Sequence, residues 1–110
     1  MTTYELAAKQ ATGRTAEMSN ALVSQKEQVE LLIKKGELFA AKRLLDTLHP
    51  LWNHLDYGYK GRELYRAIRD AARATIAEEQ DYLSKIRKND RTRHSTEANV
   101  ARLEALVLEC

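Results

Sequence analysis

Hydrophobic residues recur every three or four positions along most of the chain, and this period predicts amphipathic helices. The first such row consists of Tyr4, Leu6, Met18, Leu22, Val29 and Ile33. Thr2 and Glu5 have the spacing of a capping box, so we expect this helix to begin at about Thr3. Gly13 interrupts the row, and a continuous or kinked helix is favoured over a break because good helix formers flank it. Residues 34–36, Lys-Lys-Gly, are typical of a helix end.

The second row begins near residue 37 and forms a wide apolar face. Its members are Leu38, Ala41, Leu44, Leu45, Leu48, Leu51, Trp52 and Leu55. Trp52 continues the leucine row, so we expect it in the core. Pro50 removes a backbone donor and disfavours the helical conformation at His49. The favoured interpretation is a helix to about Leu48 and a short second piece from Pro50 to about Leu55. One helix with a kink at Pro50 is the alternative.

Two further helices are predicted in the second half of the chain. Residues 56–61, Asp-Tyr-Gly-Tyr-Lys-Gly, are interpreted as a loop. A third helix then runs from about Arg62 to Arg87, with its apolar line at Tyr65, Ile68, Ala72, Ile76, Leu83 and Ile86. Residues 85–94 are too polar for a core and are interpreted as a helix end and linker. Ser95 or Thr96 caps a fourth helix, whose apolar stripe is Val100, Leu103, Leu106 and Val107.

The composition agrees with helices and argues against β architectures. Only 4 glycines and 1 proline occur in 110 residues, too few for the turns of a sandwich or barrel. Each predicted helix is apolar on one face only, so the helices must cover one another. Short connections favour antiparallel neighbours. We therefore expect one all-α domain over residues 1–110, a compact antiparallel bundle of about four principal helices.

The sequence lacks the residue patterns of common active sites. It has no HExxH segment, no pair of cysteines and no glycine-rich phosphate loop. Cys110, the single cysteine, has no recognisable base and is interpreted as an incidental exposed thiol. His49 is expected to donate to backbone carbonyls left free by Pro50. We therefore predict a protein that is not an enzyme, with no catalytic residues, no metal and no cofactor. No apolar run is long enough for a membrane, and a cytoplasmic location is expected.

Basic residues are concentrated in one segment, although the whole chain has a formal net charge of only +2. Residues 57–94 hold ten basic and six acidic residues. Within them, four arginines have helical spacing and should form one stripe about 16 Å long: Arg62, Arg66, Arg69 and Arg73. Arginine suits forked contacts with phosphate or carboxylate. The alternative is an ordinary solvated face, because Glu63 and Asp70 have the spacing to pair with these arginines.

The predicted loop before this stripe is the second candidate for a binding site. Its glycines would let a partner approach the backbone closely, and it leads into a helix N-terminus, which favours anions. Lys60 adds a positive charge, while Tyr57 and Tyr59 could stack on a base. The alternative is a glycine turn whose tyrosines cover the seam between helices.

These observations favour a small non-enzymatic protein that binds a macromolecular partner, as an adaptor or inhibitor acting by occlusion. The expected partner is an acidic protein surface, bound by the arginines, Tyr57, Tyr59 and Lys60. A nucleic-acid or nucleotide-phosphate binder using the same residues is the alternative. A structural homo-oligomer, joined along the first helix, is the third hypothesis.

Overall fold

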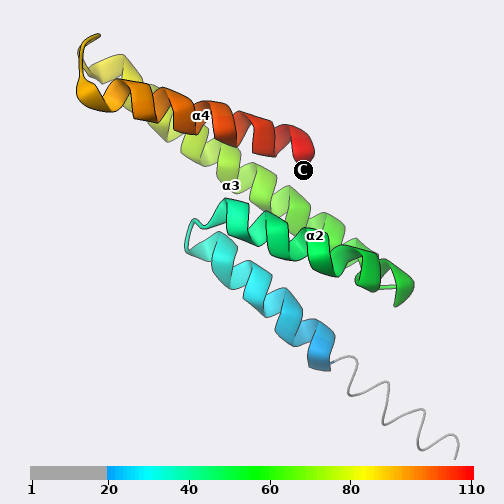
Figure 1. Ribbon diagram of the computed structural model, residues 1–110. Coiled ribbons are helices and arrows are strands. Elements are labelled where there is room, and N and C mark those ends of the chain that lie inside the picture. The colour runs from blue at the N-terminus through cyan, green and yellow to red at the C-terminus, as the bar shows by residue number, and fades with distance from the viewer. Residues whose placement is uncertain (1–19) are drawn as a thin grey trace, which may run out of the picture.

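The described part of the chain consists of helices and short connections. The structure, a computed structural model, describes residues 20–110. A helix occupies residues 20–34 and is followed by α2 (Leu38–His54), α3 (Gly58–Lys85) and α4 (Arg91–Glu109). Because the connections are short, consecutive helices run antiparallel (Figure 1). The expected all-α antiparallel bundle is confirmed, while the continuous or kinked helix expected around Gly13 lies outside the described residues.

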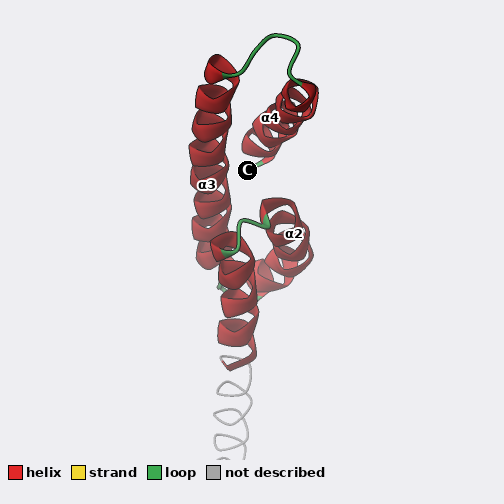
Figure 2. Ribbon diagram, turned by 90° about the vertical axis from the view of Figure 1, so that its left-hand side faces the viewer, coloured by secondary structure: helices red, strands yellow, loops and turns green. Residues whose placement is uncertain are grey.

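The longest of these helices, α3, is the spine of the bundle. Its 28 residues span about 42 Å at the usual helical rise, more than the 17 residues of α2 or the 19 of α4. The first half of α3 is covered by α2 and its second half by α4 (Figures 1 and 2). The start of α2 therefore meets the end of α4, where Lys42 Nζ lies 3.4 Å from Glu109 Oε2.

The core is centred where the helix of residues 20–34, α2 and the first half of α3 meet. Its largest fully buried side chains are Trp52, Leu45, Ile68 and Val29. The indole Nε1 of Trp52 donates a hydrogen bond of 3.0 Å to Oε1 of Gln25, so its polar atom is satisfied. This confirms Trp52 as a core residue. The second half of α3 is covered by α4 instead. The buried side chains of α4 are Val100, Leu103 and Leu106.

Pro50 does not divide the second helix, and the favoured expectation of two pieces is wrong. Helix α2 continues through Pro50 to His54 as one element. An interior proline costs a helix about 3 kcal/mol. Burial of one large side chain contributes about as much, and the last turn of α2 buries Trp52 completely. The free energy gained by burying Trp52 thus offsets the free-energy cost of placing Pro50 inside a helix.

The predicted loop over residues 56–61 is also wrong for most of its length, because α3 begins at Gly58. Only residues 55–57 connect the two helices. Gly58 and Gly61 lie in the first turn of α3 and are buried. A Cβ atom on Gly58 would collide with the side chain of Asn53, and one on Gly61 with the imidazole of His49. The two glycines therefore allow α2 and α3 to approach closely, which is a different role from turning the chain.

The turn between α2 and α3 is made by Asp56 instead. Asp56 has a φ of 57°, in the left-handed region that ends many helices. The backbone N–H of Tyr57 then donates to the carbonyl oxygen of Trp52 at 2.8 Å. Gly36, with a φ of 79°, ends the preceding helix in the same way, with Glu37 N–H donating to Leu32 O at 2.9 Å. The predicted helix end at residues 34–36 is confirmed.

The last helix begins earlier than predicted, at Arg91, so the connection to it is residues 86–90 only. Asp90 is its N-cap and accepts a hydrogen bond of 2.8 Å from the backbone N–H of Thr92. The expected caps, Ser95 and Thr96, lie inside α4. The prediction failed because polar composition was taken as evidence for a linker. Residues 91–94 are polar but form the first turn of α4.

Arg93 joins the two helices at this end of the molecule. Its guanidinium donates to the carbonyl oxygens of Leu83 at 3.0 Å, Ile86 at 2.9 Å and Arg87 at 3.2 Å. These carbonyls lie at the C-terminal end of α3, where no further helical N–H groups are available. Arg93 therefore closes the end of α3 with a side chain from α4.

Replacing Gly61 with alanine tests the close packing of α2 on α3. In an open helix this change stabilises by roughly 1 kcal/mol. Here the new methyl group meets the His49 imidazole, so we expect the free energy of unfolding to fall by about 1–3 kcal/mol. Urea unfolding measures it. In a His49→Ala background the same change should cost much less, and an equal cost in both backgrounds would contradict the proposed contact.

Replacing Arg93 with lysine tests the cap on α3. Lysine keeps the charge but loses the fork that reaches three carbonyls, so the free energy of unfolding should fall by about 1–3 kcal/mol. Arg91→Lys is the matched control, because Arg91 is exposed in the first turn of the same helix, and its effect should stay within about 0.5 kcal/mol. Equal effects of the two changes in urea unfolding would refute the capping role.

Candidate functional site

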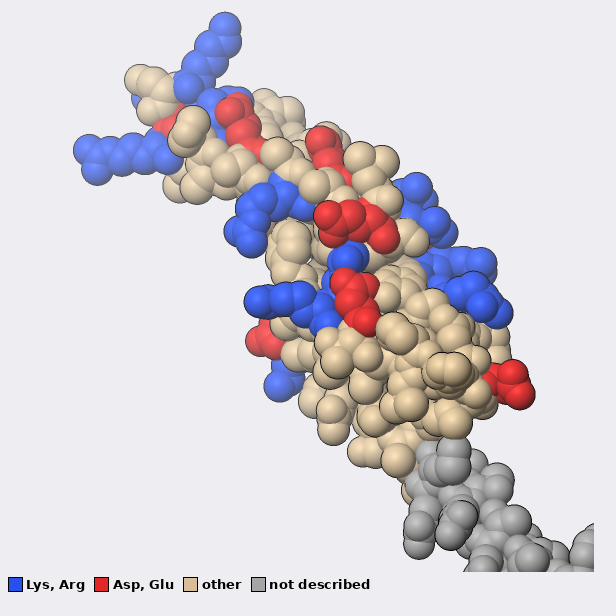
Figure 3. All heavy atoms as spheres, turned by 45° about the vertical axis from the view of Figure 1, so that its right-hand side comes forward, with Lys and Arg blue, Asp and Glu red and all other residues tan. Residues whose placement is uncertain are grey.

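The four arginines of the predicted stripe all lie on α3. Arg62, Arg66 and Arg73 are exposed, and Arg69, nearest the buried face, is partly buried. We call these four residues the arginine row. Figure 3 shows Lys and Arg side chains gathered in several groups along one face of the molecule, with acidic side chains between them.

The carboxylates expected to neutralise the arginine row do not pair with it. Six ion pairs with N···O distances up to 4.0 Å occur in residues 20–110, and none includes an arginine of the row. Glu63 binds Lys60 instead, at 3.2 Å. Within the described chain, the row therefore presents four charges without an ion-pair partner.

A hollow of about 240 Å³ opens beside three of these arginines. It is lined by Arg62, Tyr65, Arg66, Arg69 and Cys110, and we call it the arginine hollow. The Nε–H of Arg69 is buried and finds no acceptor among residues 20–110. An unpaired buried donor costs about 1–3 kcal/mol, so this N–H is an unsatisfied donor.

The tyrosine of the arginine hollow is held by a carboxylate of α2. Tyr65 donates a hydrogen bond of 2.5 Å to Oδ1 of Asp46, and Nζ of Lys42 donates to Oδ2 of the same carboxylate at 2.7 Å. Burial raises the pKa of Asp46, but the hydrogen bonds from Lys42 and Tyr65 outweigh it and bring the pKa below its ordinary value. Burial and the hydrogen bond to Asp46 raise the pKa of Tyr65. The phenol therefore stays neutral, and Lys42 balances the charge of Asp46.

Cys110 is not the incidental exposed thiol that we expected. It is partly buried and packs against the core. Burial raises the pKa of its thiol, although the nearby positive charges of Lys42 and Arg69 act in the opposite direction. The thiol is therefore neutral near pH 7 and places no negative charge in the arginine hollow.

His49 does not take the role expected for it. Its Nε2 is buried and has no partner among residues 20–110, so it donates to none of the carbonyls of the described chain. The ring instead stands edge-on against Tyr65, with centroids 5.3 Å apart, and covers Gly61. His49 is a packing residue between α2 and the first turns of α3.

The predicted tyrosine and lysine anchors are divided between core and surface. Tyr57 is partly buried and stands edge-on to Trp52, with ring centroids 5.3 Å apart. Tyr59 is 48% exposed, and Lys60 Nζ lies 5.6 Å from the centre of its ring. Arg62 and Tyr59 line a second hollow of about 240 Å³, together with Asp56. Tyr59 is therefore the anchor that lies open beside the arginine row.

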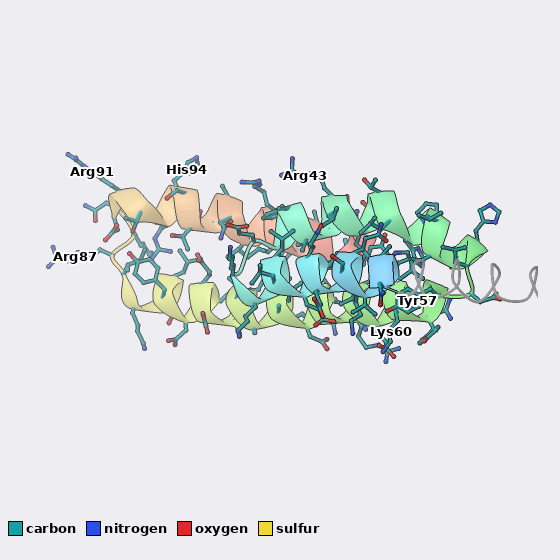
Figure 4. The ribbon with its side chains drawn as sticks, turned by 90° about the horizontal axis from the view of Figure 1, so that it is seen from below. Arg43, Tyr57, Lys60, Arg87, Arg91 and His94 are labelled. Atoms are coloured by element: carbon teal, nitrogen blue, oxygen red, sulfur yellow. The ribbon has the colours of Figure 1, made fainter. Side chains whose placement is uncertain are left out.

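Two surfaces were not found from the sequence. One is the end of the α3–α4 hairpin, where Arg87 and Arg91 project away from the molecule (Figure 4). The other is a groove of about 430 Å³ between the start of α2 and the end of α4, where Arg102 lies over the ring of Phe39. Sequence periodicity could not reveal this groove, because it forms only where the start of α2 and the end of α4 come together on α3.

The link between Asp46, Lys42 and Tyr65 predicts a dependence of stability on pH. The pKa of Asp46 is lowered in the folded protein, so the ionised carboxylate stabilises the fold. This stabilisation is fully present above the pKa of Asp in the unfolded chain, about 3.9, and is lost as the pH falls through the folded pKa. Asp46→Asn should therefore destabilise the protein at pH 7 and make little difference near pH 2. Urea unfolding of the unmodified protein and of Asp46→Asn between pH 2 and pH 7 measures the difference in their free energies of unfolding. A difference that does not change with pH would contradict the role of the Asp46 carboxylate.

The described residues and the comparisons leave the arginine row as the main functional lead. None of the helices in residues 20–110 has the length and apolar character needed to cross a membrane. The same residues contain no group of three His, Cys, Asp or Glu side chains suited to a metal ion. No protein family, curated protein or solved structure matches this chain.

Proposed function

We propose that this protein binds an acidic macromolecular partner through the arginine row and Tyr59, and that it acts by occlusion without turnover. The observation that carries the proposal is the absence of any ion pair to the row within residues 20–110. Arginine and tyrosine are the residue types that most often dominate binding energy at interfaces.

The geometry of the row suits a flat or ridged partner. The row lies on one rigid helix, so binding requires little ordering of the backbone. Its side chains alternate with apolar and glycine positions that are buried against α2, which fixes the direction in which the row faces. An acidic ridge on the partner could contact several guanidiniums at once.

The neighbouring charges favour a protein over a nucleic acid. Glu63 and Asp70 are exposed on the same helix, one turn or less from the arginines. A nucleic-acid backbone carries phosphates along its whole length, so one lying along α3 would place some of them beside these carboxylates and be repelled there. A protein surface can place its own cations opposite them, and such mixed complementarity also fixes the register of a complex.

A synthetic partner tests the proposal without the natural one. The probe is a fluorescein-labelled peptide of twelve glutamates, and its binding is measured by fluorescence anisotropy at 50 mM NaCl. Arg66→Glu with Arg73→Glu should weaken binding at least tenfold, because both side chains are exposed members of the row. Helicity and melting temperature should change little.

Arg43→Glu is the matched control, since Arg43 is exposed on α2 and points away from the side on which Lys60 lies (Figure 4). It should weaken binding less than twofold. An equal loss in both variants would mean that only net charge matters and would refute the proposal. Tighter binding of a twenty-base-pair duplex, with a steep salt dependence, would replace it with the nucleic-acid alternative. Sedimentation of the pure protein tests the homo-oligomer hypothesis separately.

A further inference from the structure

The arginine hollow differs from the rest of the arginine row because three arginines line one concavity. Arg62, Arg66 and Arg69 line it from one helix, and Cys110 lines it from the end of α4. Arg73 belongs to the row but does not line the hollow. A small group entering here would therefore meet three guanidiniums instead of one.

The charges around the arginine hollow are not balanced by the described chain. No carboxylate of residues 20–110 pairs with its three arginines. On α2, Asp46 is already bound by Lys42 and by the hydroxyl of Tyr65. On α4, Glu109 pairs with Lys42. The side chains that line the hollow carry a formal charge of +3.

The hydrogen-bonding capacity of the site is also unfilled. The buried Nε–H of Arg69 has no acceptor in the described residues, and no hydrogen bond of Arg62 or Arg66 is formed by a side-chain nitrogen within them. Guanidiniums offer several N–H donors in a fixed plane. An oxyanion held in the hollow would supply acceptors to the guanidiniums that line it.

We propose that the arginine hollow binds a phosphate monoester dianion. Such a group carries nearly two negative charges and three acceptor oxygens, which match three guanidiniums better than a carboxylate does. The phosphodiester of a nucleic-acid backbone carries a single charge and two linked neighbours, so it matches three guanidiniums less well. This inference rests on the proposed function, since it names the group that the row would recognise on its partner.

The test uses the whole protein and small probes that isolate the chemistry of the group. Phenyl phosphate, dimethyl phosphate and acetate are titrated separately at pH 7.5 in 150 mM NaCl. The readout is the NMR cross-peak of the Arg69 Nε–H. Phenyl phosphate should shift this peak with saturation in the range of roughly 1–10 mM. Dimethyl phosphate and acetate should bind at least tenfold more weakly.

Two lysine variants separate shape from charge. Arg69→Lys keeps the charge but removes the Nε–H and the planar fork, so phenyl phosphate should bind at least fivefold more weakly, as followed by the Nε–H peaks of Arg62 and Arg66. Arg43→Lys is the matched control, because Arg43 is exposed on α2 and belongs to neither the arginine hollow nor the arginine row, and it should leave binding unchanged. Equal losses in the two variants, or no saturable shift with phenyl phosphate in the unmodified protein, would overturn the proposal.

Two peptides distinguish a modified protein from a free metabolite as the source of the group. One carries phosphoserine between glutamates, and the other carries serine in its place. If the source is a protein partner, the phosphopeptide should bind more tightly than phenyl phosphate, and Arg66→Glu with Arg73→Glu should remove that advantage. If the phosphopeptide and phenyl phosphate bind with equal affinity, the site is instead assigned to a small phosphate ester. Binding of both peptides with no phosphate effect would refute this inference and leave the proposed function standing.

Discussion

The close approach of α2 and α3 is the constraint on which the rest of the structure depends. Gly58 and Gly61 let the first turn of α3 pack against Asn53 and His49, and Trp52, next to Asn53 on α2, is completely buried. Because successive helical residues are related by a fixed rotation and rise, placing the first turn of α3 also sets the face on which each later residue lies. The arginine row faces outward for this reason, and Arg69 lies at the border of the buried face.

The fold was largely predictable because its helices follow a simple hydrophobic period. The rows through Leu45, Ile68 and Leu103 were recognised in the sequence, and all three residues are buried. The errors fall where tertiary packing overrides local preference. Pro50 was expected to interrupt a helix that the burial of Trp52 maintains, and Gly58 and Gly61 were expected to turn the chain where they instead admit a neighbouring helix.

The candidate site was predictable in its residue types and only partly in its form. Helical spacing placed the arginines of the row on one edge of α3, and the structure agrees. Spacing could not decide whether Glu63 would bind Arg66 or Lys60, because several rotamers compete on an exposed face, and Lys60 is its partner. Helical spacing also could not predict that Cys110 and Tyr65 line the same hollow, because this depends on the antiparallel packing of α4 along α3.

The convergence of α2 and α4 on one helix has a consequence for how the molecule moves. Cys110, which directly follows α4, lines the arginine hollow together with Arg62, Arg66 and Arg69 of α3. A group held in the hollow would contact both of these segments and would therefore oppose local opening of α4 from α3. The stability of this junction would then be linked to the occupancy of the hollow.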